Sequence, residues 1–138
     1  MFVLDTDHAS ELAFRSTAGI RLLNRLSESE TDVVISAITV EEQLRGWLAE
    51  IRRRKPEDQA AAYARLIRQT EIIASWQVLP WDEDSVRIFN SLKEQKIRIG
   101  TQDLKIAAIT LAHDATLLTR NTRDFDRIPG LKIENWLD

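Results

Sequence analysis

Four carboxylates stand where apolar runs of the chain end, at Asp5, Glu42, Asp103 and Asp124. Around the first three the sequence reads MFVLDTD, VVISAITVEEQLRG and IRIGTQDLKIAA, so that each acid follows a strand signal or lies near the start of a helix. In an α/β sheet such positions gather at the carboxyl edge, where ligands bind. Carboxylates crowded together repel one another unless a hard cation lies between them. The pattern therefore predicts a Mg²⁺ or Mn²⁺ site and chemistry on phosphate groups.

The chemistry expected of such a site is metal-assisted attack on a phosphate. Asp5 directly follows an apolar strand, which places its carboxylate at the C-terminal end of that strand. Mg²⁺ and Mn²⁺ take oxygen ligands and share them with substrate phosphates. One ion could activate a water molecule while a second, about 3.5–4 Å away, stabilises the leaving oxygen. Helix N-termini beside Glu42 and Asp103 would add backbone N–H groups that face the phosphate.

Each acid also has a purely structural interpretation. Thr39 to Glu42 fits a capping box, in which the Glu42 side chain bonds back to the start of its helix. Asp103 lies in the first turn of a helix with Thr101 as the expected cap, where an acid complements the helix dipole. Asp5 could simply end its strand, and Asp124 could belong to a surface turn. These separate explanations do not require the acids to share one edge of the sheet, and their shared placement favours the site.

Strand and helix signals alternate along the chain. The apolar segments that predict strands are residues 2–4, 33–35, 78–79, 116–119 and 131–133. The segments that predict helices are residues 8–27 with a break at Gly19, 39 onward, Pro56 to about 75, a helix capped by Asp82, and 100–111. Strands separated by helices predict an α/β fold in which a parallel sheet carries helices on both faces.

The helices between residues 39 and 75 are long for a simple connection between strands, so we expect them to project as a clip or an oligomer contact. They carry the basic run Arg52–Lys55 and, further on, Arg65 and Arg68. In one interpretation the run is a solvated helix end, where cations complement the dipole. In the other it is a patch that contacts phosphates.

Length and composition limit the class of protein. The 138 residues match one ordinary domain, predicted to span 1–138, and the 43% hydrophobic and 30% charged residues are typical of a globular chain. The absence of cysteine excludes disulfides and thiolate metal sites. With no recognisable signal peptide and no apolar run near the roughly 20 residues of a membrane span, we expect a soluble cytoplasmic protein. The net charge of −3 does not in itself indicate nucleic-acid binding, but metal held by clustered acids would reverse the charge locally.

The two histidines, His8 and His113, lack the spacing of a metal site. His113 ends an apolar helix and is predicted to interact with the C-terminal end of the helix dipole. His8 lies three residues after Asp5 and could assist a site there.

Four segments, FVLDTD, ISAITVEEQLRG, IGTQDLKIAA and LLTRNTRDFDRIPGLKIENW, together resemble a VapC-type toxin of the PIN-domain superfamily. The resemblance runs from the first residue to the last few and is least distinctive at about residues 50–75. It implies a three-layer α/β/α fold around a parallel sheet of about five strands. It further implies a Mg²⁺-dependent endoribonuclease that cuts RNA and is held inactive by a cognate antitoxin. Homodimers are usual in the family.

The resemblance also assigns residues. The first acid of the family matches Asp5, its glutamate matches Glu42 and its third acid matches Asp103. At the fourth acidic position this chain has Asn121, and Asp124, three residues on, is the alternative source of the carboxylate. These assignments imply that Asp5 and Asp103 bind the first metal and that Glu42 orients or deprotonates the attacking water. Asn121 and Asp124 would complete the surroundings of the site.

A second departure is Asp7, at a position where the family commonly has asparagine. Asp7 either adds negative charge beside the site or caps the following helix, while Thr6 matches the small polar residue usual there.

Two other functions remain open at the level of sequence. Asp5-Thr6-Asp7 fits the DxD opening of a haloacid-dehalogenase-like phosphatase, with Asp5 as nucleophile and Asp7 as general acid. That family also needs a distal lysine and a paired acidic motif, and no convincing match for the pair is present. In the other alternative the acids are only caps, and the chain is a non-catalytic module that binds RNA or a protein partner.

Overall fold

A parallel sheet of five strands forms the centre of the molecule. The computed structural model describes all residues from 1 to 138. The strands are β1 (Phe2–Leu4), β2 (Val33–Ser36), β3 (Val78–Leu79), β4 (Thr116–Leu118) and β5 (Lys132–Glu134). Their order across the sheet is β3-β2-β1-β4-β5, and every neighbouring pair is parallel. The predicted α/β class and the count of about five strands are confirmed.

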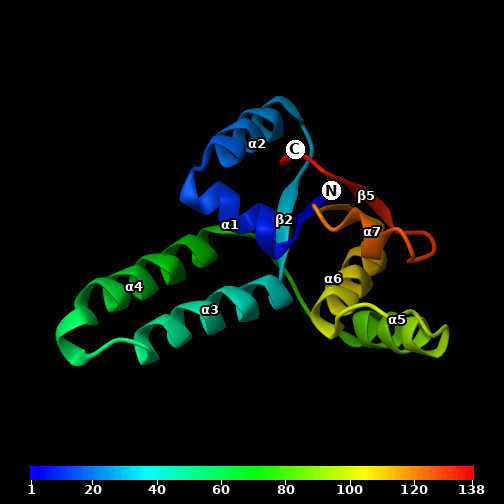
Figure 1. The fold of residues 1–138 in the computed structure, drawn as a ribbon. Coiled ribbons are helices and arrows are strands. Elements are labelled where there is room, and N and C mark those ends of the chain that lie inside the picture. The colour runs from blue at the N-terminus through cyan, green and yellow to red at the C-terminus, as the bar shows by residue number, and fades with distance from the viewer.

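Helices cover both faces of this sheet (Figure 1). They are α1 (Thr6–Phe14), α2 (Thr17–Glu28), α3 (Ala37–Arg52), α4 (Ala60–Ser75), α5 (Glu83–Glu94), α6 (Thr101–Ala112) and α7 (Thr122–Phe125), with a short 3₁₀ helix at Pro56–Asp58. Helices α1 and α2 lie on one side, and α5 and α6 lie on the other (Figure 1). No helix is both long and apolar enough to cross a membrane.

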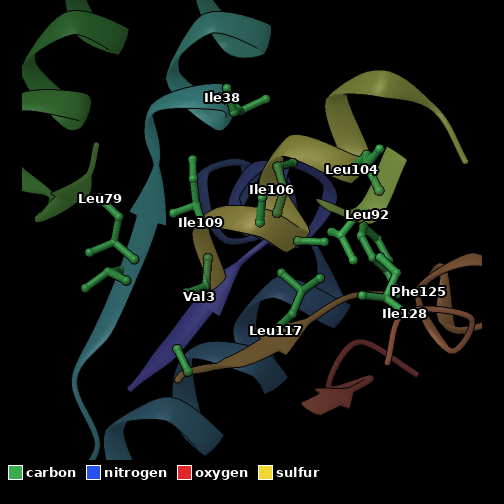
Figure 2. Packing of buried hydrophobic residues seen from close by; sticks show 14 residues of the cluster. Val3, Ile38, Leu79, Leu92, Leu104, Ile106, Ile109, Leu117, Phe125 and Ile128 are labelled. Carbon is green, nitrogen blue, oxygen red and sulfur yellow. The ribbon is translucent and has the colours of Figure 1, made fainter. Parts of the chain in front are cut away.

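The strands are apolar on both faces because each face is covered. On the face of α5 and α6, Val3, Val34 and Leu117 pack with residues such as Ile106 and Ile109 of α6 (Figure 2). The next residue of each of these strands, Leu4, Ile35 and Leu118, faces the opposite way and packs with Ala9, Leu22 and Leu26. Side chains of a strand alternate between its two sides, so a strand buried on both sides reads as a continuous apolar run. The three layers are confirmed.

The helices differ in how deeply they lie. Helix α6 is buried along most of its length, including Leu104 and the run from Ile106 to Thr110. The predicted projection of α3 and α4 is confirmed, because the pair extends from the body of the molecule as an arm (Figure 1). At the end of α3, Arg52 lies in the last turn, and Arg53 and Arg54 both pair with Glu50.

The predicted helix break at Gly19 is wrong. The chain breaks at Arg15, which has a left-handed backbone with φ 51°, and Ser16 then caps α2 by accepting a hydrogen bond from the backbone N–H of Gly19. Gly19 is needed for close packing instead, because a Cβ atom there would lie 2.0 Å from the carbonyl oxygen of Glu11 on α1. The glycine marks where two helices touch rather than where one ends.

Two predicted helix caps are also wrong. Helix α3 starts two residues earlier than predicted, and its cap is Ser36, whose hydroxyl accepts from the backbone N–H of Thr39 at 3.2 Å. At α6 the cap position is held by Gly100, which offers no side-chain bond, and Thr101 is already helical. The Asp82 cap of α5 and the His113 position at the end of α6 are confirmed.

Candidate active site

Three of the four predicted acids lie on segments that follow strands at the centre of the sheet, and Asp103 lies in the first turn of α6. Leu4 at the end of β1 is in register with Ile35 of β2 and with Leu118 of β4. Asp5 comes directly after β1, while α3 begins at the end of β2 and the segment from Thr119 to Asp124 follows β4. The register therefore brings residues that are about thirty and more than a hundred positions apart to one edge of the sheet.

Asp5 caps α1 and is almost completely buried, with 8% of its surface exposed. Its Oδ1 atom accepts hydrogen bonds from the backbone N–H of His8 at 2.8 Å and from the ring Nδ1 of His8 at 3.1 Å. The other oxygen, Oδ2, makes no hydrogen bond within the protein. Local capping thus fixes the carboxylate and leaves one oxygen for a ligand.

Glu42 does not close the predicted capping box. Its Oε1 atom accepts a 2.6 Å hydrogen bond from the hydroxyl of Thr6 at the start of α1. The same hydroxyl lies 3.1 Å from the hydroxyl of Thr39, which is fully buried. The side chain of Glu42 is therefore turned toward the end of β1, where Asp5 lies, and the capping-box explanation of Glu42 is wrong.

Asn121 links the remaining two acids. Its side-chain Nδ2 donates to Oδ2 of Asp103 at 3.3 Å and to Oδ2 of Asp124 at 3.1 Å. Both candidates for the fourth acidic position therefore lie beside Asp103: Asn121 donates the hydrogen bonds, and Asp124 accepts one of them. An aspartate at 121 could not donate in this way when ionised.

The electrostatic environment connects these side chains. Burial raises the pKa of Asp103, the hydrogen bond from Asn121 opposes this, and the negative charges of Glu42, Asp5 and Asp124 raise the pKa further. No lysine or arginine forms an ion pair with any of these four carboxylates. The edge of the sheet thus gathers negative charge without a protein cation to balance it.

The chemistry of the donors fits Mg²⁺ or Mn²⁺. One oxygen of each of the four carboxylates, Asp5, Glu42, Asp103 and Asp124, is held by a hydrogen bond within the protein and the other is not. No buried side-chain oxygen lacks a partner, so the unbonded oxygens reach solvent. Nevertheless, no three of the histidine, aspartate and glutamate side chains are close enough to form a metal cage by themselves. An ion here would need water or substrate oxygens as well, which is the usual habit of Mg²⁺.

A family model described as PIN domain matches residues 2–131. The chain belongs to the PIN-domain family. The matched region contains Asp5, Glu42, Asp103, Asn121 and Asp124, and the resemblance inferred from the sequence is confirmed.

The relatives of this PIN domain are VapC proteins. It is 45% identical over 60 residues to Ribonuclease VapC1 of Rickettsia felis, a match that covers 41% of this chain and 45% of that protein. This chain spans only about a third to a half of the length of the curated Rickettsia relatives that it matches at 43–47% identity. Over 139 residues, covering 98% of this chain and 97% of the relative, it is 29% identical to the tRNA(fMet)-specific endonuclease VapC of Salmonella typhimurium. The solved structure of VapBC-1 from nontypeable Haemophilus influenzae is 27% identical, with a TM-score of 0.75 over 99% of this chain and 98% of that one.

Beside Glu42, the PIN domain has a cleft of about 300 Å³ between α1, α3 and α4. Thr6 and Glu42 line it next to the acids, and Ala13, Phe14 and Trp47 give it an apolar part. Phe14 is 68% exposed, so this apolar part of the cleft is open to solvent.

Asp7, the second departure from the family pattern, does not cap α1, because Asp5 has that position. Its carboxylate lies 3.4 Å from the guanidinium of Arg120, which also approaches Glu11 at 3.5 Å and Asp138 at 3.6 Å. Arg120 was not identified from the sequence, and only its place beside Asn121 could have suggested it. It balances the added charge of Asp7 and ties α1 to the segment after β4.

Proposed function

We propose that this PIN domain is a metal-dependent endoribonuclease that hydrolyses RNA phosphodiester bonds and acts as the toxin of a toxin–antitoxin pair. The observation that carries the proposal is the gathering of Asp5, Glu42, Asp103 and Asp124 at the carboxyl edge without a cationic partner. The relatives are named ribonuclease and endonuclease, which supports the same reaction. A carboxylate with a raised pKa at a sheet edge is more typical of a reaction site than of a structural ion pair.

Asp5, Asp103 and Glu42 are the residues that would hold Mg²⁺, or Mn²⁺ in its place. When bound, such an ion would polarise the phosphate and lower the pKa of a bound water. Oδ2 of Asp5 and Oδ1 of Asp103 are free to act as ligands, since their other oxygens are held by His8 and Asn121.

The chain itself supplies orientation and proton transfer. Thr6 fixes one oxygen of Glu42, and the other is free to accept a proton from the attacking water. Asn121 keeps Asp103 and Asp124 in place by donating to both. The first turn of α6 has no side-chain cap, so its backbone N–H groups remain available to a phosphate oxygen.

The partner expected of such a toxin is a cognate antitoxin. The cleft beside Glu42 combines the apolar side chains of Ala13, Phe14 and Trp47 with the carboxylate of Glu42, and Arg65 also lines it, so it suits a peptide segment that is partly apolar and presents an Arg or Lys to Glu42. Such a cation would satisfy the carboxylates in place of the metal. Co-purification with a small protein encoded next to this gene tests this part of the proposal. Homodimer formation stays a prediction, to be measured by light scattering.

The central test is RNA cleavage by the purified chain and its Asp5→Asn variant. Cleavage should stop in EDTA, return with Mg²⁺ or Mn²⁺ and be absent in the variant. Asp82→Asn is the matched control, because Asp82 caps α5 in the way that Asp5 caps α1 but lies outside the site. Cleavage by Asp5→Asn at the wild-type rate, or no Mg²⁺ binding in calorimetry, would contradict the proposal.

A further inference from the structure

His8 is a fully buried polar side chain for which the proposed reaction has no role. It lies in the first turns of α1 with none of its surface exposed. Both of its ring nitrogens have a partner: Nδ1 lies 3.1 Å from Oδ1 of Asp5, and Nε2 lies 3.3 Å from the backbone nitrogen of Trp136. The imidazole thus connects the most buried acid of the site to a segment 128 residues away.

The backbone of Trp136 decides which nitrogen of His8 carries the proton. A backbone N–H can only donate, so Nε2 of His8 must accept with its lone pair. The proton of the neutral ring is then on Nδ1, which donates to Oδ1 of Asp5. The same oxygen also accepts from the backbone N–H of His8, and two donors from one residue therefore hold it.

We propose that His8 is a positioning residue for Asp5, and that Trp136 sets the orientation in which it works. Two donors on Oδ1 stop the carboxylate from rotating and leave Oδ2 as the oxygen offered to a metal ion. Groups that hydrogen-bond to metal ligands commonly control affinity in this way. The inference rests on the proposed function, because it concerns the carboxylate that would bind the metal.

Several contacts hold Trp136 in place, so the position of its backbone N–H relative to His8 is well defined. Its indole N–H donates to Glu134 at 2.5 Å, and the guanidinium of Arg25 lies 4.1 Å from the centre of its ring. The ring of Phe2, on β1, meets it edge to face at 4.7 Å between centroids. The segment after β5 is thus anchored to α2 and β1, and through His8 it reaches the site.

A merely structural role makes a different prediction from a positioning role. If His8 only fills space and satisfies Trp136, its replacement lowers stability and leaves metal affinity unchanged. If it positions Asp5, loss of the Nδ1 donor must weaken metal binding even in a variant that remains folded.

The experiment compares His8→Leu with His8→Asn by calorimetry with Mg²⁺, together with kcat and KM for RNA cleavage. Leucine removes the donor, and we expect Mg²⁺ affinity to fall about 10- to 100-fold. The amide of asparagine can donate from nearly the position of Nδ1, so we expect affinity within about 3-fold of wild type. Ser85→Ala is the control: Ser85 donates to Asp82 across the same three-residue spacing, and its loss should lower Tm without changing Mg²⁺ affinity.

A second measurement does not depend on any variant being folded. Two-bond ¹H–¹⁵N NMR of the metal-free wild-type protein should show His8 in the Nδ1–H form, and an Nε2–H form would overturn the proposal. Wild-type Mg²⁺ affinity in a folded His8→Leu variant would also overturn it, as would an equal loss in folded Leu and Asn variants. A wild-type protein that binds no Mg²⁺ would instead refute the proposed function, and this inference with it.

Discussion

Asp82 and Asp103 both stand at the N-terminal ends of helices, and those helices, α5 and α6, pack against each other. The pKa values of the two carboxyls nevertheless shift in opposite directions. The backbone N–H of Ser85, and then its hydroxyl, lower the pKa of Asp82 at distances of 3.0 and 2.9 Å. Burial and the neighbouring carboxylates raise the pKa of Asp103, although Asn121 donates to it.

The difference lies in the neighbours and not in the helix. An acid at the start of a helix is stabilised by the dipole in both cases. Asp82 is surrounded by donors from its own first turn, whereas Asp103 faces the carboxylates of Glu42, Asp5 and Asp124. A carboxylate whose charge is unfavourable where it lies is typical of a functional site.

The largest expected effect that tests this contrast is on catalysis. Asp103→Asn should lower kcat for RNA cleavage by at least about 100-fold, since this proposed metal ligand would lose its charge. Asp82→Asn should leave kcat unchanged. Initial rates at saturating Mg²⁺ measure both, and equal effects of the two variants would remove the distinction.

The next effect is on stability and concerns Asn121, whose hydrogen bond to Asp103 opposes the repulsion from the neighbouring carboxylates. Asn121→Asp removes the bonds to Asp103 and Asp124 and adds another negative charge, which should lower metal-free stability by about 1–3 kcal/mol. Mg²⁺ should recover part of this loss, because an added carboxylate gives the ion a further ligand. Urea unfolding with Mg²⁺ and with EDTA measures the recovery; a loss that Mg²⁺ leaves unchanged would argue against a metal at this edge.

A smaller effect, on thermal stability, is expected from Asp82, which caps α5. Asp82→Ala should lower Tm by a few degrees at neutral pH. Because the pKa of Asp82 is lower in the folded state, its contribution is present above the ordinary value of about 4 and is lost as the pH falls through the folded value. The Tm difference between wild type and variant should therefore shrink at acidic pH. A difference that grew there would show that the pKa of Asp82 is not lowered by folding.

The smallest effect has the opposite sign. Asp103→Asn should raise metal-free stability at neutral pH, because the raised pKa means that ionisation of Asp103 disfavours folding. The side chain is half-buried and partly screened by solvent, so we expect a gain below about 1 kcal/mol. The gain should disappear below about pH 4, where the wild-type carboxyl is protonated as well. Chemical unfolding at pH 7 and pH 3.5 checks both the sign and the pH dependence.

The placement of Asp5, Glu42 and Asp103 could be predicted because each is marked locally by an apolar run and the start of a helix. The contacts that orient them could not, since they join distant positions: Thr6 meets Glu42 across 36 residues, and His8 meets Trp136 across 128. The end of α1 at Arg15 could not be predicted, because the residue that adopts the left-handed conformation there is an arginine and not a glycine. Ser36 was missed as a cap because it also ends β2.

The central position of β1 has a consequence for how the chain folds. Phe2 to Leu4 pair with β2 and also with β4, whose residues come more than a hundred positions later. Pairings between such distant segments close large loops and make folding slow, on the order of milliseconds to seconds. The step that docks β4 beside β1 also brings Asn121 toward Asp103. The site of the proposed nuclease should therefore be complete only after β4 has paired with β1.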